Sequence, residues 1–416
     1  MAKKNLILVT AGFPYGESEQ SFLRPEFDRL VKEFQVTVLA PETAESIKYP
    51  IPEDISVIPY SFPAEGKLKR LLKLPGRLLR PYVITELLRA VKNCPRKTLR
   101  SRLHEIIFYL SKAERFKPVL QDLIKKTDAE YVYTYWCSPV TLTAAELKRK
   151  HARLKVLTRF HGVDLYNERL KTLWQPFRQR IAEKCDRLVF VCEAGRQYFL
   201  SHWSPCSKEA AILSYLGCRP MKAVSPISSN ILTLVSCSNA IPLKRIHLII
   251  EALALLPNTL RINWHHIGDG SELESLQQLS AERFAAKPNI DWQFHGYIPN
   301  TNLSDLYSEI CPDIFITTSS TEGGTPVSIQ EAFSAGIPAI GTAVGGIPEL
   351  IRSGQTGYLL SADPEPEEIA QAVSAFAACT PQQLADMRSA VFSLWRDNLN
   401  AEVNADHFVS ILKAIP

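Results

Sequence analysis

Short apolar runs rich in β-branched residues alternate along this chain with longer stretches whose apolar positions recur every three or four residues. The first pattern predicts buried strands and the second predicts amphipathic helices. The expected strands cover 5–12, 35–41, 129–136, 154–162, 186–193, 231–238, 261–268, 290–297, 314–320 and 337–344. The expected helices cover 21–34, 141–150, 171–184, 245–256, 271–285, 302–310 and 327–335. Strands that alternate with helices indicate βαβ units, so we predict an α/β protein with two Rossmann-like domains and parallel sheets.

A chain of 416 residues is too long for one ordinary core and suits two domains of roughly 200 residues each. The segment 221–230, MKAVSPISSN, is polar, rich in Ser and Pro, and precedes a new strand, as a linker does. We therefore predict an N-terminal domain over 1–225, a C-terminal domain over 226–395, and a last helix over 396–416 that packs back on the first domain. Because ligands bind at the carboxyl ends of parallel strands, we expect the site in a cleft between the two sheets.

No segment has the length and apolar content of a leader or a membrane span. The apolar run Leu6–Val9 is too short for a signal peptide, and the run 246–256 is interrupted by Glu251. The nine cysteines are scattered without a CxxC pair, which favours free thiols over disulfides or metal ligands. A reducing compartment, the cytoplasm, is the expected location.

Basic residues are concentrated between 67 and 117, although the net charge is only +5. The acidic residues there are Glu86, Glu105 and Glu114, and leucines are interspersed throughout the segment. Such a segment favours contact with an anionic membrane, at about 1 kcal/mol per basic residue. The alternative is a solvated helical face over the first core. Pro75, Pro81 and Pro95 are expected to cut the segment into short pieces, and no reader motif indicates nucleic-acid binding.

The most informative segment is 317–360, where a predicted strand leads through a Gly-rich turn into a helix. The turn is Glu322-Gly323-Gly324-Thr325-Pro326. Backbone amides at a helix N-terminus bind anions, which suits a diphosphate. Glu331 falls in an apolar part of the helix, where a carboxylate needs hydrogen bonds that sugar hydroxyls would supply. Gly345-Gly346 permits another close backbone approach.

This segment resembles the donor-binding signature of the retaining glycosyltransferase family 4, whose members share the GT-B fold. The matching residues are Glu331-Ala332, Gly336, Pro338, Ile340 and Gly345-Gly346-Ile347-Pro348-Glu349. Eight residues separate Glu322 from Glu331, where the family has seven. The resemblance implies that Glu331 binds the nucleotide ribose and that Glu322 binds the transferred sugar. The alternative is an ordinary capped turn before a core helix.

Three further turns of the second half carry the resemblance. In Asn239–Arg245, Lys244 matches a family lysine that neutralises leaving-group charge, whereas Asn239 stands where the family has arginine. Arg245 is a candidate substitute for that arginine. Gly268 and Gly270 match a G-D-G turn near the nucleotide. Tyr297 and Ile298 belong to a segment that flanks the base, where we expect backbone contacts.

In the first half, Arg159–Asp164 places His161 and Asp164 at the end of a predicted strand. A lone histidine is usually structural, but the resemblance implies that His161 lies beside the reacting sugar. Asp164 then either fixes the loop or contacts the acceptor. Gly16 lies in the loop after the first strand, which in the family approaches donor phosphate and acceptor. Glu19 and the following Phe22 resemble the S-E-x-F pattern of enzymes that build bacterial polysaccharides, although two residues separate them here.

The resemblance implies retaining transfer of a sugar from a UDP- or GDP-linked donor to a hydroxyl, without a metal or other cofactor. No Asp or Glu pair is placed as the nucleophile and acid of a glycosidase. The expected acceptor is a lipid-linked saccharide at the cytoplasmic membrane face, in capsule, exopolysaccharide or lipopolysaccharide assembly. Two alternatives are another GT-B enzyme acting on a soluble sugar phosphate and a non-catalytic subunit that binds a sugar nucleotide.

Overall fold

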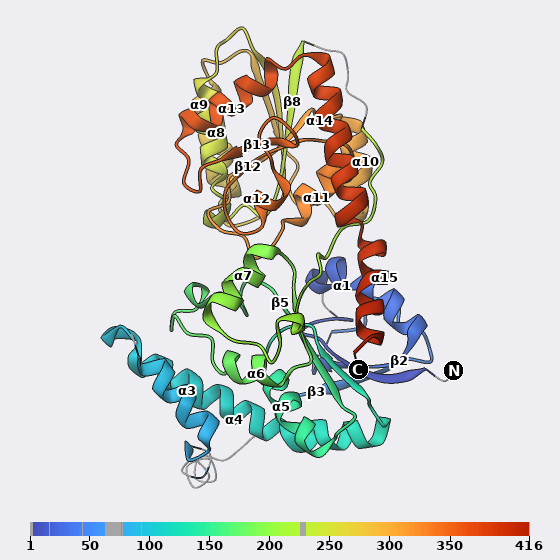
Figure 1. Ribbon diagram of the computed structural model, residues 1–416. Helices are drawn as coiled ribbons and strands as arrows, with labels where there is room; N and C mark the ends of the chain where they lie inside the picture. The colour runs from blue at the N-terminus through green and yellow to red at the C-terminus, as the bar shows by residue number, and fades with distance from the viewer. Residues whose placement is uncertain are drawn as a thin grey trace. The chain divides into compact units, whose positions relative to one another are not determined.

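A computed structural model describes residues 3–15, 17–43, 45–62, 76, 78–92, 94–224 and 230–415 (Figure 1). The chain divides into two compact units, which we describe separately. Unit 1 contains Met1–Ser214 together with Ala405–Pro416, and unit 2 contains Tyr215–Asn404.

Both unit boundaries differ from the predicted ones at 225/226 and 395/396. The segment after Ser214 is held by unit 2, because the Met221 amide donates to Ser334 Oγ at 3.1 Å and the Val224 amide donates to the Ala335 carbonyl at 3.0 Å. Trp395 and Leu399 lie in the core of the same unit. The polar linker is therefore not where the units separate.

Unit 1 is built on a seven-stranded sheet with the order β3-β2-β1-β4-β5-β6-β7. Every neighbouring pair is parallel, which confirms the α/β fold expected from the alternation of strands and helices. The strands are β1 (Lys4–Val9), β2 (Phe34–Pro41), β3 (Ser56–Tyr60), β4 (Tyr131–Thr134), β5 (Lys155–Phe160), β6 (Arg187–Phe190) and β7 (Ala211–Leu213). The helices are α1 (Glu17–Glu33), α3 (Pro81–Val91), α4 (Arg96–Thr127), α5 (Pro139–Leu147), α6 (Arg178–Lys184) and α7 (Glu193–His202).

Unit 2 contains a six-stranded parallel sheet with the order β10-β9-β8-β11-β12-β13. The strands are β8 (Ile231–Cys237), β9 (Arg261–Ile267), β10 (Ile290–Phe294), β11 (Ile314–Thr317), β12 (Ala339–Thr342) and β13 (Gly357–Leu360). The helices are α8 (Ile246–Leu255), α9 (Leu273–Phe284), α10 (Asn300–Ile310), α11 (Val327–Ser334), α12 (Ile347–Leu350), α13 (Pro366–Ala377) and α14 (Pro381–Leu394). Figure 1 shows α8, α9 and α13 on one side of this sheet and α10 and α14 on the other.

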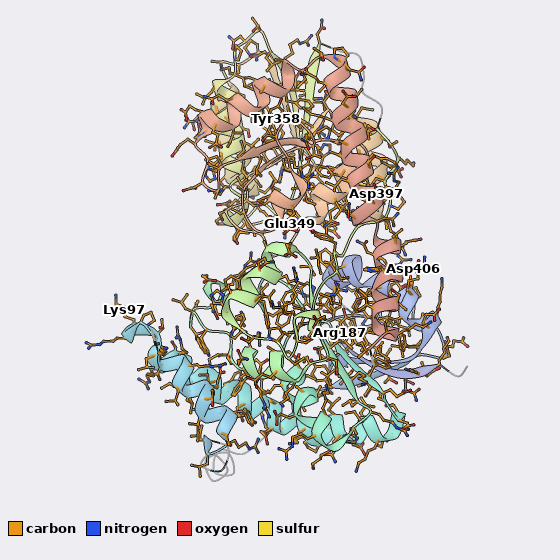
Figure 2. All side chains as sticks on the ribbon, viewed as in Figure 1. Lys97, Arg187, Glu349, Tyr358, Asp397 and Asp406 are labelled. Atoms are coloured by element: carbon orange, nitrogen blue, oxygen red, sulfur yellow. The ribbon has the colours of Figure 1, made fainter. Side chains whose placement is uncertain are left out.

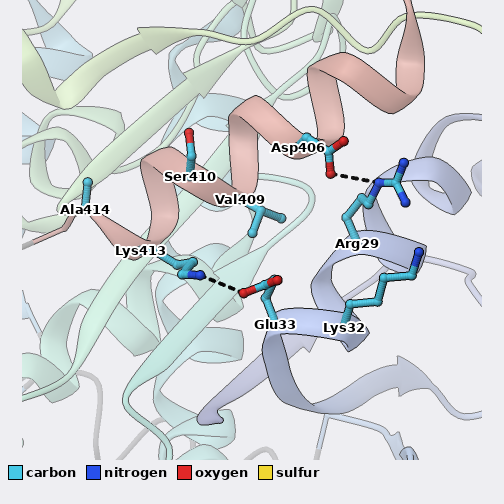
Figure 3. A pocket seen from close by; sticks show the side chains of 8 residues that line it. All are labelled: Arg29, Lys32, Glu33, Asp406, Val409, Ser410, Lys413 and Ala414. Carbon is cyan, nitrogen blue, oxygen red and sulfur yellow. Dashed lines mark hydrogen bonds and ion pairs between the residues drawn. The ribbon is translucent and has the colours of Figure 1, made fainter. Parts of the chain in front are cut away.

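The last helix, α15 (Ala401–Lys413), contains the second unit boundary. Its unit 1 part packs beside α1, where Arg29 Nε lies 2.8 Å from Asp406 and Lys413 Nζ lies 2.6 Å from Glu33. Figure 2 labels Asp406 on this helix, and Figure 3 shows both ion pairs in the groove between the two helices. The ring of Phe408 packs 5.2 Å from that of Tyr133 in β4, which joins α15 to the sheet.

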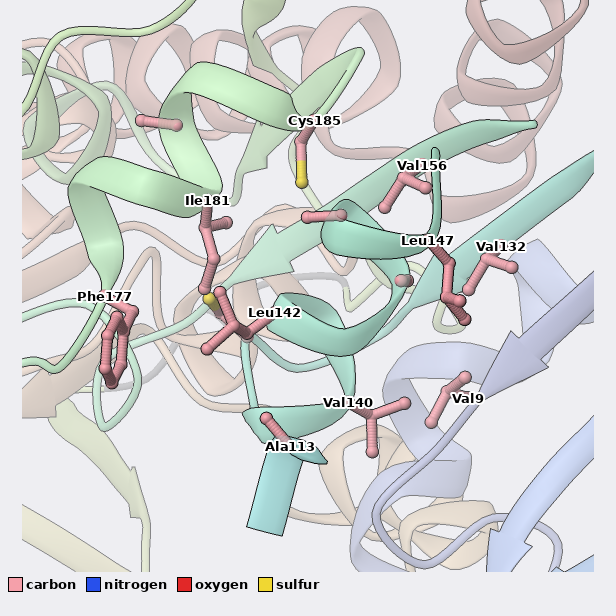
Figure 4. Close-up of a cluster of buried hydrophobic side chains, with 14 of the residues drawn as sticks. Val9, Ala113, Val132, Val140, Leu142, Leu147, Val156, Phe177, Ile181 and Cys185 are labelled. Atoms are coloured by element: carbon pink, nitrogen blue, oxygen red, sulfur yellow. The ribbon is translucent and has the colours of Figure 1, made fainter. Parts of the chain in front are cut away.

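The core of unit 1 lies where α4, α5 and α6 cover one face of the sheet (Figure 4). Val9, Val132 and Val156 come from three adjacent strands and meet Val140 and Leu147 of α5. β4 is buried at every position, as expected for a central strand of a parallel sheet that is covered on both faces. In the part of the chain that the structure describes, no helix has the length and hydropathy needed to cross a membrane.

The basic segment differs from its prediction in one respect. Pro81 and Pro95 do not interrupt helices but stand at their beginnings, at the first position of α3 and at the N-cap of α4. Proline suits the start of a helix, because the amide it lacks would have no partner there. The resulting α4 has 32 residues and continues through Pro118.

Candidate active site

Three loops of unit 2 interlock at the carboxyl edge of its sheet, after β8, β9 and β10. A Cβ added to Gly268 would lie only 1.9 Å from the Ser238 carbonyl oxygen. The Ala240 amide donates to the Asp269 carbonyl at 2.8 Å, and the Gly268 amide donates to the Gly296 carbonyl at 2.9 Å. The first two loops are therefore in backbone contact, and the third is hydrogen-bonded to the second.

The sequence-predicted residues of these loops lie close together. Asn239 and Tyr297 have exposed side chains, and Ile298 is half-buried. Gly270 has a φ of +156°, and a Cβ there would lie 2.4 Å from the Ala240 carbonyl oxygen. Glycine at this position thus serves the contact with the loop after β8, whereas Asn239 and Tyr297 remain open to a ligand.

Lys244 ends a short 3₁₀ turn, Pro242–Lys244, that is tied to the end of β11. The Ser320 amide donates to the Leu243 carbonyl at 2.9 Å, and Thr318 Oγ1 donates to the Lys244 carbonyl at 3.0 Å. This attachment places Lys244 Nζ 2.5 Å from Glu322 Oε1. The two side chains are 20% and 14% exposed, so the ion pair still reaches solvent. The structure thus brings two predicted site residues into direct contact.

Arg245 belongs to the scaffold of this edge. Its guanidinium donates to the backbone carbonyls of Thr318, Ser319 and Ala362 and pairs with the carboxylate of Asp363. These bonds hold the loop after β11 to the loop after β13. The structure therefore gives Arg245 a role different from the substitute diphosphate ligand that the sequence suggested.

The turn from Glu322 to Pro326 packs against the glycine pair after β12. Gly345 has a φ of +55°, and a Cβ there would lie 2.5 Å from the Glu322 carbonyl oxygen. The Gly346 amide donates to the Gly324 carbonyl at 3.0 Å. The two glycines thus make the close backbone approach expected of them, and they make it to this turn.

Helix α11 begins directly after this turn. Pro326 is its N-cap residue, and no side-chain hydrogen bond caps the helix there. Thr325 is buried and its hydroxyl accepts a hydrogen bond from Gln330 Nε2 at 2.9 Å, which fixes the turn. Gly323 and Gly324 are half-buried. The backbone amides at the helix N-terminus are thus not capped by the side chain of the N-cap residue, and such amides favour the binding of a phosphate.

Glu331 lies on α11 and is buried. Asn300 Nδ2 donates to its Oε1 at 2.6 Å. The charge of Glu331 contributes to the raised pKa values of the nearby side chains of Cys218, Cys237 and Tyr307. Burial raises the pKa of Glu331 to about 7, and the Asn300 hydrogen bond opposes this rise. A carboxyl that is this poorly solvated gains from any further hydrogen-bond donor, such as the hydroxyls of a polyol.

In unit 1, Glu19 anchors the loop that follows β1. Its buried carboxylate accepts hydrogen bonds from the amides of Ala11, Gly12 and Phe13, the last two at 2.6 and 2.7 Å. It also accepts from Trp136 Nε1 at 2.7 Å. Glu19, expected on the acceptor side, is thus occupied with fixing the loop. Gly16 lies outside the described residues.

Asp164 fixes the loop after β5, which is one of the two roles expected for it. Its two oxygens accept from the amides of His161 at 2.7 Å and Cys137 at 2.8 Å. Burial raises the pKa of Asp164 to about 6, and the charge of Arg178 opposes that rise. The carboxyl therefore links the segments that follow β4 and β5. Each of its oxygens accepts a hydrogen bond from a backbone amide of the protein.

His161 is buried, yet among the described residues neither of its ring nitrogens has a hydrogen-bond partner. The ring lies 4.0 Å from that of Trp136, with 30° between the planes. Burial and the nearby charge of Arg159 hold the pKa of His161 well below its usual range. The imidazole is therefore neutral at pH 7, with one donor and one acceptor nitrogen that the described residues leave unpaired.

Sequence reasoning missed Trp136 and Asn300. Trp136 is the last residue of the predicted strand 129–136, and the carboxyl end of a strand is where ligand contacts are expected. Asn300 begins α10, and its distance from Glu331 in the sequence gave no sign of their contact.

Residues 220–390 match the family described as Glycosyl transferases group 1. This segment is similar to group 1 glycosyl transferase domains. It contains Lys244, Glu322 and Glu331, and the match confirms the resemblance to glycosyltransferases that the motifs indicated.

Relatives and solved structures extend the match to both units. The chain is 25% identical over 293 residues to a colanic acid biosynthesis glycosyltransferase, WcaL, of Escherichia coli K12, covering 67% of this chain and 69% of that protein. A glycosyltransferase from Rickettsia africae ESF-5 superposes with a TM-score of 0.68 at 16% identity, over 100% of this chain and 99% of that one. Anabaena Alr3699/HepE in complex with UDP and glucose gives a TM-score of 0.66 at 16% identity, over 99% of this chain and 100% of that one. The chain has the GT-B fold.

Proposed function

We propose that this glycosyltransferase transfers a sugar, with retention, from a UDP- or GDP-linked donor to a hydroxyl of a lipid-linked saccharide. The observation that supports this most strongly is the Lys244–Glu322 pair beside the start of α11, inside the segment that matches the group 1 family. The solved relative with bound UDP supports a nucleoside diphosphate donor, and the colanic acid relative supports polysaccharide assembly. Capsule, exopolysaccharide or lipopolysaccharide synthesis at the cytoplasmic membrane face is the corresponding setting.

In this proposal the binding of a donor separates Lys244 from Glu322, and each side chain then binds a different part of the donor. Lys244 Nζ turns to the diphosphate, and Glu322 accepts hydrogen bonds from the hydroxyls of the transferred sugar. Glu331 takes the ribose hydroxyls, and the α11 amides add their positive field to the diphosphate. Charge develops on the departing diphosphate in the transition state, where fixed positive groups contribute most.

Retention follows if the acceptor hydroxyl attacks from the side on which the diphosphate leaves. The bond between the anomeric carbon and the diphosphate oxygen breaks, and the bond to the acceptor oxygen forms on the same face. The departing phosphate oxygen takes the hydroxyl proton. His161 binds a hydroxyl of the reacting sugar through one ring nitrogen in this scheme.

The first test is thermal melting of the full chain with saturating UDP, GDP or ADP, each with and without EDTA. A nucleotide at 100 times its dissociation constant should add about 2.7 kcal/mol to the stability. We expect UDP or GDP to raise the melting temperature equally well in EDTA, followed by turnover with the matching sugar nucleotide. Stabilisation without turnover would favour a non-catalytic binding subunit, and no stabilisation by any nucleotide would overturn the donor site.

Membrane contact is proposed for the exposed face of α3 and the start of α4. Ile84, Leu88 and Val91 share one face of α3 and are 42%, 68% and 49% exposed. Leu79, just before the helix, is 73% exposed. The acidic residue of α3, Glu86, is turned inward and accepts hydrogen bonds from Trp174 Nε1 and the Phe177 amide.

Exposed cations lie in the same part of the chain as these apolar side chains. They are Arg89, Lys92, Arg96, Lys97 and Arg100, and Figure 2 labels Lys97 at the start of α4. An apolar stripe flanked by cations suits the headgroup region of an anionic bilayer. The rest of the predicted contact segment, 67–75, 77 and 93, lies outside the described residues.

Flotation with vesicles tests this contact. Leu88→Asp should weaken binding to phosphatidylserine-containing vesicles about tenfold or more, because it removes an apolar side chain from the bilayer and adds a negative charge. Leu255→Asp is the matched control, because Leu255 is 51% exposed on α8 of the other unit. Equal flotation of the wild type with anionic and neutral vesicles would contradict the proposal.

A further inference from the structure

The sheet of unit 1 reverses its direction of winding between β1 and β4. From β1 the strand order runs through β2 and β3 on one side and through β4 to β7 on the other. In open α/β sheets, ligands bind outside the carboxyl ends of the strands at such a switch point. The residues that follow these two strands are the Ala11–Phe13 loop and the segment beginning with Tyr135 and Trp136.

Trp136 connects the loops after β1 and β5. Its indole nitrogen donates to Glu19 Oε1 at 2.7 Å, and the same carboxylate binds the amides of the loop after β1. Its ring faces that of His161 at 4.0 Å. Trp136 itself is half-buried, so it is not simply part of the hydrophobic core.

His161 needs such a neighbour. Asp164 binds its backbone amide, which fixes the chain but not the ring. Neither ring nitrogen has a hydrogen-bond partner among the described residues, so no polar contact holds the imidazole in one rotamer. The imidazole packs against the rings of Trp136 and Tyr135, the latter at 5.1 Å.

We propose that Trp136 is a positioning residue for His161, held in place by Glu19, so that the unpaired imidazole nitrogens meet a hydroxyl of the sugar substrate. This rests on the proposed function for the identity of the substrate. The amides of Ala11, Gly12 and Phe13 hold the Glu19 carboxylate. That carboxylate accepts a hydrogen bond from the indole of Trp136, and the indole packs against the imidazole of His161. Each charge-assisted hydrogen bond to Glu19 stiffens the indole against rotation.

A purely structural role makes a different prediction. If Trp136 only filled space, its replacement would lower stability and leave the state of His161 and the turnover number unchanged. As a positioning residue, it should affect the imidazole even where the fold survives. A misplacement of about 1 Å at a reacting group can cost about 100-fold in rate.

The chain offers a control with the same chemistry. Trp174 Nε1 donates to Glu86 Oε1 at 2.9 Å, and Trp174 is also half-buried in unit 1. Trp174→Phe thus removes an indole hydrogen bond to a buried carboxylate without touching His161. Trp136→Phe removes the equivalent bond but keeps an aromatic ring, and Trp136→Ala removes both.

The experiment combines kinetics with nitrogen NMR of ¹⁵N-histidine-labelled full chain, in which a His161→Gln variant assigns the His161 signals. We expect a neutral His161 in one tautomer in the wild type, and a pKa closer to the ordinary histidine value in Trp136→Ala because water reaches the ring. The turnover number should fall about 100-fold in Trp136→Ala and about tenfold in Trp136→Phe, with the donor KM within about twofold of the wild type. Trp174→Phe should leave both readouts unchanged.

Wild-type His161 signals and turnover in Trp136→Ala, with only a lower melting temperature, would overturn the proposal. If Trp136→Ala does not fold, Trp136→Phe and Glu19→Gln give the same comparison. The NMR readout needs no sugar transfer, so it decides the positioning role even if the proposed activity fails.

Discussion

Replacing Lys244 with alanine should lower the turnover number about 100- to 1000-fold, the range found when a fixed group that stabilises developing negative charge is removed. Lys244 Nζ lies 2.5 Å from Glu322 and 20% of its side chain is exposed, so it is both held in place and accessible to a diphosphate. Its loss also leaves Glu322 unneutralised. The donor KM should therefore rise as well, because an uncompensated carboxylate repels the diphosphate.

Lys222→Ala is the matched control for this change. Lys222 Nζ also lies 2.5 Å from a carboxylate, that of Asp305, but the pair is 67% and 70% exposed. Steady-state kinetics of both variants, with melting temperatures to show that each is folded, separate the loss of a particular cation from the loss of any surface ion pair. Turnover of Lys244→Ala within about threefold of the wild type would remove Lys244 from the proposed mechanism.

Most of the fold could be predicted because the central strands are continuous apolar runs. The strands that the sequence did not reveal are β3, β7 and β13. Each lies at the outer edge of its sheet, and β7 has only three residues. β3 also contains Pro59, which an edge strand tolerates because one side of its backbone has no neighbour to bond. Short strands with one partner leave little periodicity to read.

The candidate site was predicted as a set of turns, and its internal bonding was not. A lysine and a glutamate separated by 78 positions form an ion pair only because Ser320 and Thr318 tie the turn before α8 to the end of β11. Arg245, next to that lysine, is drawn to backbone carbonyls instead. Adjacent basic residues thus receive different roles from contacts that no local pattern encodes.

The candidate site residues of unit 1 also show that the sequence does not predict which groups a side chain will contact. A resemblance to the S-E-x-F pattern drew attention to Glu19, but only the structure shows that its carboxylate accepts hydrogen bonds from backbone amides and from Trp136. A buried acid that is saturated by its own protein looks, in sequence, the same as one that waits for a ligand. Burial and hydrogen-bond partners decide between these readings.

A buried ion pair beside His161 supports the largest stability prediction. Arg159, on β5, pairs with Glu26 of α1, and the two side chains are 1% and 8% exposed. The guanidinium also donates to Tyr133 Oη at 2.8 Å and to the Ser214 carbonyl at 2.9 Å, and it lies 4.8 Å from the ring of Phe408. Burial raises the pKa of Glu26, and the charge of Arg159 opposes that rise. The pair thus joins α1, β5 and α15 around one cation.

Glu26→Ala should destabilise the protein by about 3–5 kcal/mol, because it leaves the permanently charged guanidinium buried without an anion. Urea unfolding followed by tryptophan fluorescence measures this loss of stability. Asp122→Ala is the control, because Asp122 forms an exposed ion pair with Lys126 at 2.9 Å on α4. Loss of that pair should cost under about 1 kcal/mol. A double variant, Glu26→Leu with Arg159→Met, should recover much of the loss, because it removes both charges and keeps the volume. If Glu26→Ala costs no more than the control, the Arg159 charge must be satisfied by Tyr133 and Ser214 alone. The pair would then contribute nothing to holding α1 and α15 on the sheet.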